Sequence, residues 1–269
     1  QLLHDLPSLP NFGGSLVPFE ASLLGGLDPV TEICKPRSQK DLFDAVGQTS
    51  AAFLSSARSW GGKWDPDEYY DADPGAAGDF KMYTRHLAVL NRGHDPADDY
   101  DLRDFGMTTL ENLTMDHRAR MLMEAHLKCL KLANFDKEDT RNTNVGFFTG
   151  LSGENHVYNF MTREQKLNKF SMHNISNASI VNRLSYALGC NGPCLCLDTG
   201  ESGGAAALDA AVSGMREERC GPMCFASGCE FISSPFQIIL QCAAGVLSKT
   251  GRTRVFDDSA DGSTKGEGV

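Results

Sequence analysis

The chain has 269 residues, of which 41% are hydrophobic and 22% are charged, and 35 acidic against 25 basic residues give a formal net charge of -10. This length allows one large domain or two small ones with a substantial buried core. The negative charge argues against nucleic acid or an anionic membrane surface as the main partner.

The longest apolar stretch, residues 236–247, is interrupted by Gln237 and Gln241 and is too short to span a membrane. We therefore expect a soluble, non-transmembrane protein that is at most peripheral to a membrane complex. The nine cysteines show no paired C-x-x-C spacing and no neighbouring histidine of the kind that zinc sites use. We predict no metal and no cofactor, and mostly buried, reduced thiols. Such thiols indicate a reducing compartment: the cytoplasm, or an organelle stroma or matrix after removal of a targeting segment, because the chain begins at Gln1 rather than Met.

The N-terminal part of the chain has little periodicity. Residues 1–36 are rich in Leu, Pro and Gly, which favours an extended arm on a surface or a disordered tail. A helix is predicted over 38–54, with Ser38 as its N-cap. The density of Gly, Pro and Asp predicts a loop over 60–78. Its acidic residues suit a solvated turn better than a site for a hard cation; they are Asp65, Asp67, Glu68, Asp71 and Asp73.

From residue 108 onward, helical and strand patterns alternate. One long helix is predicted over 108–134, with a buried face at Leu122, Ala125, Leu130 and Ala133. The elements predicted next are a strand at 144–150, a helix at 174–189, a strand at 193–198, a helix at 202–216, a strand at 222–231 and a helix at 235–244. This alternation predicts an α/β fold whose mixed or mostly parallel sheet is covered by helices.

The stretch 198-DTGESGGAAALDAA-211 lies at a predicted strand–turn–helix corner, and three interpretations of it compete. Ser202 in 200-GESGG-204 could be the nucleophile of a hydrolase elbow, but no histidine follows His173 to serve as its base. The corner could be plain packing, with Glu201 as a helix-start acid. The third interpretation rests on a resemblance.

Residues 182–220, NRLSYALGCNGPCLCLDTGESGGAAALDAAVSGMREERC, resemble the active-site segment of β-ketoacyl synthases (ketosynthases) of the polyketide-synthase type. Four more segments resemble the family in the same order: 64–86, 105–130, 145–150 and 256–269. The resemblance implies a thiolase-like fold, with residues 37–269 as the N-terminal half of a ketosynthase and 1–36 as a separate arm.

The resemblance places the family's nucleophilic cysteine on Glu201, with Asp198, Thr199 and Ser202 as neighbours. A carboxylate suits the positive end of a helix but cannot form the thioester intermediate. The resemblance further implies that the region of His173 shapes an acyl pocket and that strand 193–198 forms a dimer interface. It also makes Lys265 and Glu267 structural residues near the active site whose partners are absent here. The family's catalytic histidines and lysine would lie beyond Val269.

We therefore expect a catalytically inactive ketosynthase-like protein that acts as a structural subunit of a larger complex. Its partners would be other protein subunits, or a second copy bound through 193–198, with no nucleic acid and only doubtful binding of an acyl thioester. The alternative is a malonyl-thioester decarboxylase, or a chain-length-factor-like partner, in polyketide or fatty-acid synthesis.

Overall fold

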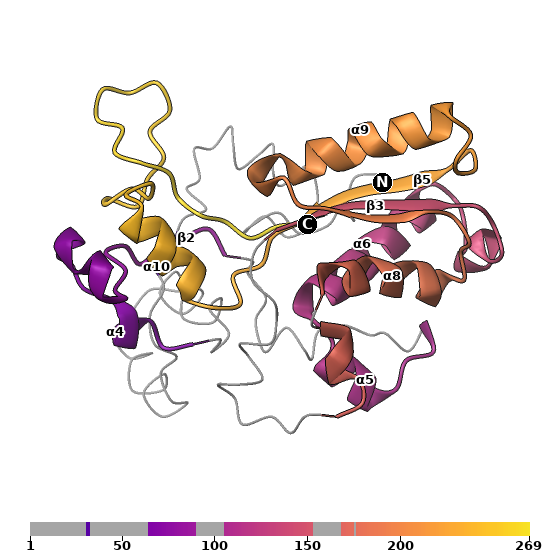
Figure 1. Ribbon diagram of the computed structural model, residues 1–269, viewed down its shortest axis with the longest axis horizontal. Helices are drawn as coiled ribbons and strands as arrows, with labels where there is room; N and C mark the ends of the chain where they lie inside the picture. Colours follow the sequence, from indigo (N-terminus) through magenta and orange to yellow (C-terminus); the bar gives the residue numbers. More distant parts are fainter. Residues whose placement is uncertain (1–30, 33–63, 90–104, 153–167, 175) are drawn as a thin grey trace, which may run out of the picture.

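The computed structural model describes residues 31–32, 64–89, 105–152, 168–174 and 176–269 (Figure 1). Most of the predicted N-terminal arm and the whole helix predicted over 38–54 lie outside these residues. No helix among the described residues is long and apolar enough to cross a membrane.

A parallel sheet forms the larger part of the molecule. Its strands are β3 (Gly146–Leu151), β4 (Cys194–Leu197) and β5 (Cys224–Cys229), in the order β4-β3-β5. Both neighbours pair with β3 in parallel. Every residue of β3 is buried because this central strand is covered on both faces, which explains its nearly continuous apolar sequence. The predicted α/β class is confirmed.

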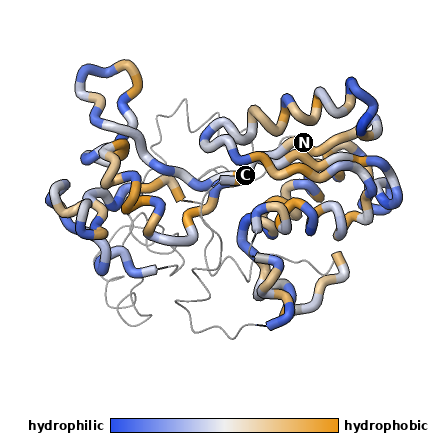
Figure 2. Tube along the Cα trace, viewed as in Figure 1, coloured by the Kyte–Doolittle hydropathy of each residue, from blue (hydrophilic) through white to orange (hydrophobic). Residues whose placement is uncertain are grey.

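Helices cover the two faces of this sheet, as Figure 1 shows. Helix α9 (Gly203–Arg216) lies on one face. Helices α6 (His117–Leu132) and α8 (Asn177–Leu188) lie on the other, with the short α5 (Thr109–Thr114) beyond them. The apolar residues of the strands and of the helix faces that meet them stand out in Figure 2. They form the main core, which includes Leu122, Leu130, Phe147, Ile180 and Leu184.

Helix α9 sits close to the sheet because its contact face is made of small residues. Ala207, Ala211 and Gly214 are buried on this face. At its first turn, Gly203 packs directly on Gly150, and a Cβ atom added to Gly150 would lie 2.2 Å from the carbonyl carbon of Gly203. The two glycines therefore fix the start of α9 against the end of β3.

A second core lies beside the sheet. It is built by α4 (Pro66–Tyr69), the 3-10 helix η1 (Pro74–Asp79), strand β2 (His86–Leu87) and α10 (Phe236–Ala243), and β2 pairs with β1 (Thr31–Glu32). Its buried residues include Trp64, Met82, Leu87, Ile232 and Ile238.

The C-terminal segment, residues 265–269, joins the two parts of the molecule. The amide of Ala88 donates to the carbonyl of Lys265 at 2.9 Å, and Gly268 and Glu230 exchange backbone hydrogen bonds of 2.9 and 3.0 Å. This segment therefore lies between the second core and the end of β5, near the middle of the molecule in Figure 1.

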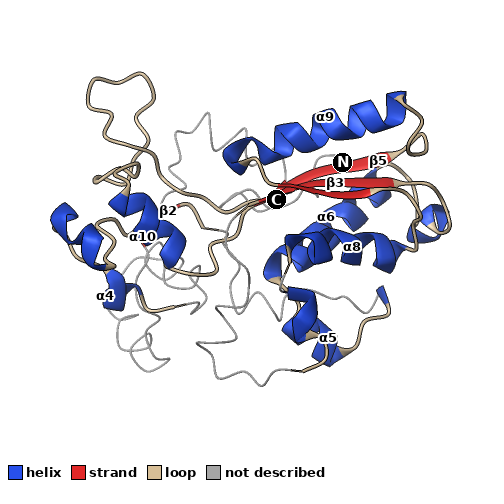
Figure 3. Cartoon of the chain, in the orientation of Figure 1, coloured by secondary structure: helices blue, strands red, loops and turns tan. Residues whose placement is uncertain are grey.

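The bounds of the elements predicted from residue 144 onward are confirmed to within three residues. Figure 3 shows the alternating helices and strands of this region. The single long helix predicted over 108–134 is wrong, because Asp116 separates α5 from α6. Its carboxylate accepts the amide hydrogen of Arg118 at 2.8 Å and so caps a new helix. Ala133, expected on the buried face, is exposed because α6 ends at Leu132.

Two further predictions need correction. The loop predicted over 60–78 contains α4 and η1, which begin where Asp65 and Asp73 accept amide hydrogens and Pro66 and Pro74 open the first turns. The thiols are less buried than expected: of the described cysteines, Cys220, Cys229 and Cys242 are buried and the others are partly or fully exposed.

Candidate functional site at the carboxyl ends of the strands

The three parallel strands end at the same edge of the sheet. Ser152 follows β3, Asp198 follows β4 and Glu230 follows β5. In open α/β sheets, ligands bind outside the carboxyl ends of the strands. This edge is therefore the candidate functional site.

The predicted strand–turn–helix corner is present at this edge. After β4 the chain turns through Gly200, whose φ of 61° suits glycine, into the 3-10 helix η5 (Gly200–Ser202) and then into α9. Asp198 and Thr199 are exposed. The Ser202 hydroxyl donates a hydrogen bond to the carbonyl of Thr199 at 2.8 Å. A carbonyl cannot remove the hydroxyl proton, so this contact does not activate Ser202 as a nucleophile.

Glu201 forms an ion pair across the site. The Nζ atom of Lys265 donates to its Oε1 atom at 2.7 Å. The lysine side chain is only 9% exposed, whereas the glutamate side chain is 85% exposed. The ammonium group is therefore held by the protein, and the carboxylate reaches it from the solvent side.

A second carboxylate, Glu230, lies near this ion pair. It accepts hydrogen bonds from Gln237 Nε2 at 3.1 Å and from Ser152 Oγ at 3.3 Å. Burial raises the pKa of the Glu230 carboxyl, and the nearby charge of Glu201 raises it further, while Lys265 and the two hydrogen bonds oppose the shift. Lys265 therefore stabilises negative charge on two glutamates.

The expectation that Lys265 and Glu267 lack their partners is wrong. Lys265 pairs with Glu201, and Glu267 Oε1 accepts the amide hydrogen of Ile232 at 3.0 Å. Both partners lie within the chain, because residues 265–269 run beside the ends of the sheet strands.

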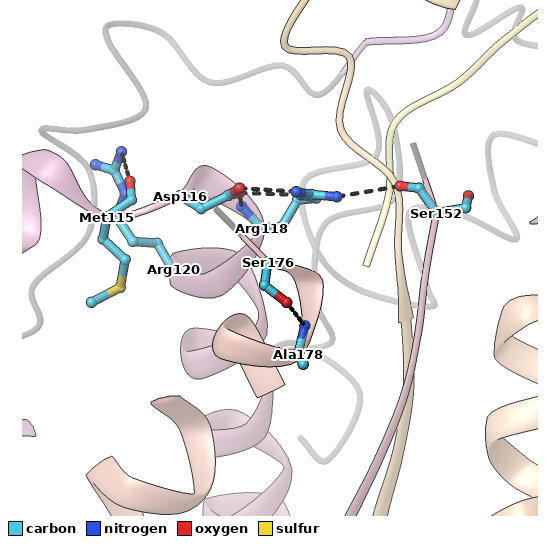
Figure 4. Close-up of polar contacts among 7 residues, drawn as sticks. All are labelled: Met115, Asp116, Arg118, Arg120, Ser152, Ser176 and Ala178. Atoms are coloured by element: carbon cyan, nitrogen blue, oxygen red, sulfur yellow. Dashed lines mark hydrogen bonds and ion pairs between the residues drawn. The ribbon is translucent and has the colours of Figure 1, made fainter. Parts of the chain in front are cut away.

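Sequence reasoning missed a second ion pair at this edge. Arg118 and Asp116 are both buried, and Arg118 Nη2 lies 2.9 Å from Asp116 Oδ2. The same guanidinium donates through Nη1 to the carbonyl of Ser152 at 3.2 Å, as Figure 4 shows. The pair thus ties the start of α6 to the end of β3. The sequence signal was an aspartate placed two residues before an arginine at a helix start.

The cysteines near this edge have the properties of inert thiols. Burial raises the pKa of Cys196 in β4 and, more strongly, that of Cys229 at the end of β5. Because the thiolate is the nucleophilic form, a raised pKa makes these residues poor nucleophiles. Neither has the features expected of a replacement for a catalytic cysteine.

The remaining candidate residues lie away from this edge. His173 is exposed in the 3-10 helix η4 (Ser171–Asn174) and lines a separate cavity. In the acidic segment, Asp65, Asp71 and Asp73 accept backbone amide hydrogens, and Asp67 pairs with Arg85 at 2.8 Å. These contacts are those of two helix caps, a turn at Asp71 and an ion pair. Among the described residues, no three His, Cys, Asp or Glu side chains are grouped so that they could hold a metal ion.

The sequence of the chain is similar to those of known proteins. Residues 53–269 match the family model described as beta-ketoacyl synthase, N-terminal domain. Polyketide synthase GfsB of Streptomyces halstedii is 33% identical over 87% of this chain, which covers 4% of that protein. The pikromycin polyketide synthase component PikAII of Streptomyces venezuelae is 31% identical over 86% of this chain, which covers 6% of that protein.

Solved ketosynthase structures share the fold. The oxazolomycin ketosynthase domain OzmH KS7 of Streptomyces albus superposes with a TM-score of 0.72 and 25% identity, over 94% of this chain and 39% of that one. The ketosynthase from module 6 of the Bacillus subtilis bacillaene synthase gives a TM-score of 0.72 at 19% identity, over 99% of this chain and 38% of that one. The predicted thiolase-like fold and the resemblance to polyketide-synthase ketosynthases are confirmed. The chain spans much less than two thirds of each of these proteins.

Proposed function

The chain belongs to the β-ketoacyl synthase family, and we propose that within it the chain is a catalytically inactive, ketosynthase-like part of a larger protein assembly, with a structural role. One observation carries the proposal. A glutamate, paired with Lys265, stands at the corner between β4 and α9, where the resemblance to the family places a nucleophilic cysteine.

The chemistry of this corner supports inactivity. A carboxylate paired with an ammonium group is a weak nucleophile, and the thioester of the family mechanism requires sulfur. The nearby Ser202 hydroxyl is engaged with a backbone carbonyl. The raised pKa values of Cys196 and Cys229 keep these thiols protonated at neutral pH.

The surface of the sheet layer supports a structural role. Strand β4 is an edge strand of the described sheet, and its Leu195 is exposed. On α9, Leu208 and Met215 are also exposed. An edge strand of the described sheet and exposed apolar side chains suit contact with another protein subunit or a second copy.

Acylation of the full natural chain tests the proposal. We expect incubation with an acyl N-acetylcysteamine thioester to leave no acyl adduct on residues 182–220, as measured by peptide mass spectrometry. The Glu201→Cys variant is the matched control. Because the Glu201 side chain is 85% exposed, iodoacetamide should alkylate the introduced thiol, which would show that the corner is accessible to a small reagent. A covalent acyl intermediate on the wild-type segment would refute inactivity.

Hydrogen exchange tests the structural role. Residues 193–198 and 202–216 should become more strongly protected when the chain is in its native assembly than when it is isolated. Equal protection in both states would count against a covered interface.

Decarboxylation of a malonyl thioester is the competing function, and the site geometry gives it one argument. The Lys265 ammonium could hold the malonyl carboxylate in place of Glu201, and the raised pKa of Glu230 would help that residue supply a proton to the carbanion left by loss of CO₂. Release of CO₂ from a malonyl thioester by the full natural chain, abolished in Lys265→Met, would favour this function. We expect no CO₂ release.

A further inference from the structure

Two cysteine thiols lie in contact at the amino ends of the sheet strands. Cys224 is the first residue of β5 and pairs with Gly146, the first residue of β3. Cys220 lies in the connection from α9 to β5, which Figure 1 shows at the right. The two Sγ atoms are 3.0 Å apart, and both thiols are free. The pair lies at the end of the sheet opposite the candidate site and takes no part in the function proposed above.

The backbone on either side of Cys220 holds this residue in place. The amide of Arg219 donates to the carbonyl of Gly214 at 2.9 Å, which ties the preceding residue to α9. The amide of Gly221 donates to the carbonyl of Asn144 at 2.6 Å, which ties the following residue to the segment before β3. The contact between the two sulfurs therefore follows from the path of the main chain.

The two thiols fill space that two glycines leave open. A Cβ atom added to Gly146 would lie 3.2 Å from Cys224 Sγ, and one added to Gly214 would lie 3.3 Å from Cys220 Sγ. Cys224 packs against the small core cluster that contains Cys220. The other buried residues of this cluster are Phe148, Ala207 and Ala211. Packing therefore confines the two sulfurs to neighbouring positions.

This arrangement suits the formation of a disulfide. The sulfurs have to approach by about 1 Å to reach the disulfide bond length of about 2.05 Å. Holding them in contact makes the bond-forming step intramolecular, which accelerates it. Burial raises the pKa of the Cys224 thiol, and the hydrogen bond with Cys220 raises it further. Because the thiolate is the reactive form, the first step with an oxidant is slow at neutral pH.

The two cysteines differ in exposure. Cys224 is partly exposed, whereas Cys220 is buried. A small oxidant therefore reaches Cys224 first, and Cys220 is placed to react with the product. We propose that Cys220 and Cys224 form a redox modification site, at which hydrogen peroxide converts the two thiols into a reversible intramolecular disulfide.

The reaction has two steps. The Cys224 thiolate attacks one oxygen of the peroxide, so that an S–O bond forms, the O–O bond breaks, and a sulfenic acid and water result after protonation of the leaving hydroxide. The Cys220 sulfur then attacks the Cys224 sulfur, the S–S bond forms, and the hydroxyl group leaves as water with the Cys220 proton. The two thiols lose two electrons in total, and the peroxide is reduced to two water molecules.

Peroxide treatment of the reduced full natural chain tests the proposal, at about pH 8.5 to raise the thiolate fraction and with dimedone present to trap sulfenic acids. After denaturation and alkylation, peptide mass spectrometry should find a bond between Cys220 and Cys224 that dithiothreitol reverses. Cys129, which is exposed on α6, is the internal control and should carry dimedone. If Cys129 is labelled while Cys220 and Cys224 remain thiols or bond to other cysteines, the proposal is wrong.

The Cys220→Ala variant isolates the second step. Without the Cys220 sulfur the sulfenic acid on Cys224 should persist, so dimedone should label Cys224 about tenfold more than in the wild type. Cys242→Ala, at another buried cysteine, is the matched control and should leave the disulfide unchanged. Equal labelling of Cys224 in the wild type and in Cys220→Ala would refute the role of Cys220. The mapping of the wild-type disulfide does not depend on the folding of either variant.

Discussion

Lys265 Nζ lies 2.7 Å from Glu201 Oε1, so an ion pair links the C-terminal segment to the corner that precedes α9. The two partners differ in exposure, with the lysine 9% and the glutamate 85% exposed. The lysine also opposes the rise in the pKa of Glu230. The two members of the pair should therefore contribute unequally to stability.

Lys265→Met should lower the free energy of unfolding by about 2 kcal/mol, because it leaves the partly buried Glu230 carboxylate without the nearby positive charge. Glu201→Gln should cost less than about 1 kcal/mol, because the lost carboxylate is solvent-exposed. Urea denaturation of the full natural chain measures both, with Lys249→Met at an exposed lysine as the control. Equal losses for the two substitutions would show that Lys265 contributes to the free energy of unfolding only through its ion pair with Glu201, and not through Glu230.

Gly150→Ala should destabilise the fold by about 3 kcal/mol, because its Cβ atom would lie 2.2 Å from the backbone of Gly203 and would push α9 off the sheet. Gly204→Ala is the matched control. A Cβ atom there meets nothing within 4 Å, so the substitution should stabilise the chain by up to about 1 kcal/mol. Thermal unfolding distinguishes the two. A neutral Gly150→Ala would contradict the close approach of β3 and α9.

Asp116→Asn should cost about 3 kcal/mol, because it leaves the buried Arg118 without its counter-ion. The surface pair formed by Arg141 and Glu138, 58% and 62% exposed, provides the comparison. Glu138→Gln should change the free energy of unfolding by less than about 1 kcal/mol. If both substitutions have the same small effect in urea denaturation, the Asp116–Arg118 pair does not hold α6 to β3.

His126 should make the fold sensitive to acid. Burial lowers the pKa of His126 from 6.5 to about 4, against the opposing hydrogen bond to the Leu122 carbonyl. The unfolded chain therefore binds a proton at this residue at a higher pH than the folded chain does. Its contribution to stability is complete above pH 6.5 and is lost progressively down to pH 4. The total loss is about 3 kcal/mol.

The control for this acid sensitivity is His126→Met, which removes the titrating group from the core. Urea denaturation between pH 4 and 7 should give a shallower dependence of stability on pH in the variant than in the wild type. Parallel curves would show that His126 does not titrate in this range on unfolding.

Local sequence patterns predicted most of the fold from residue 144 onward. The apolar run of β3 and the helical periodicity of α8 and α9 are properties of consecutive residues, and they placed these elements to within three residues. The helix predicted over 108–134 failed because an aspartate can either continue a helix or cap the next one, and only the contact with the Arg118 amide decides between them.

The candidate site was predicted only in part. The corner at Glu201 was recognisable because strand, turn and helix follow one another along the chain. Glu230 and Gln237 gave no signal, because their roles depend on neighbours from other elements. No local sequence pattern indicated that Arg183 lines the cavity beside His173, because residues from segments that are separate in the sequence line this cavity.

The sequence by itself determined the alternation of strands and helices, the small-residue face of α9 and the presence of an acid at the corner, because each depends on residues close together in the chain. Only the tertiary structure decided what that acid does. Lys265 lies 64 residues from Glu201, and it reaches the carboxylate because backbone hydrogen bonds hold residues 265–269 between Ala88 and Glu230. An ion pair between such distant residues depends on the path of the whole chain, which no local pattern records.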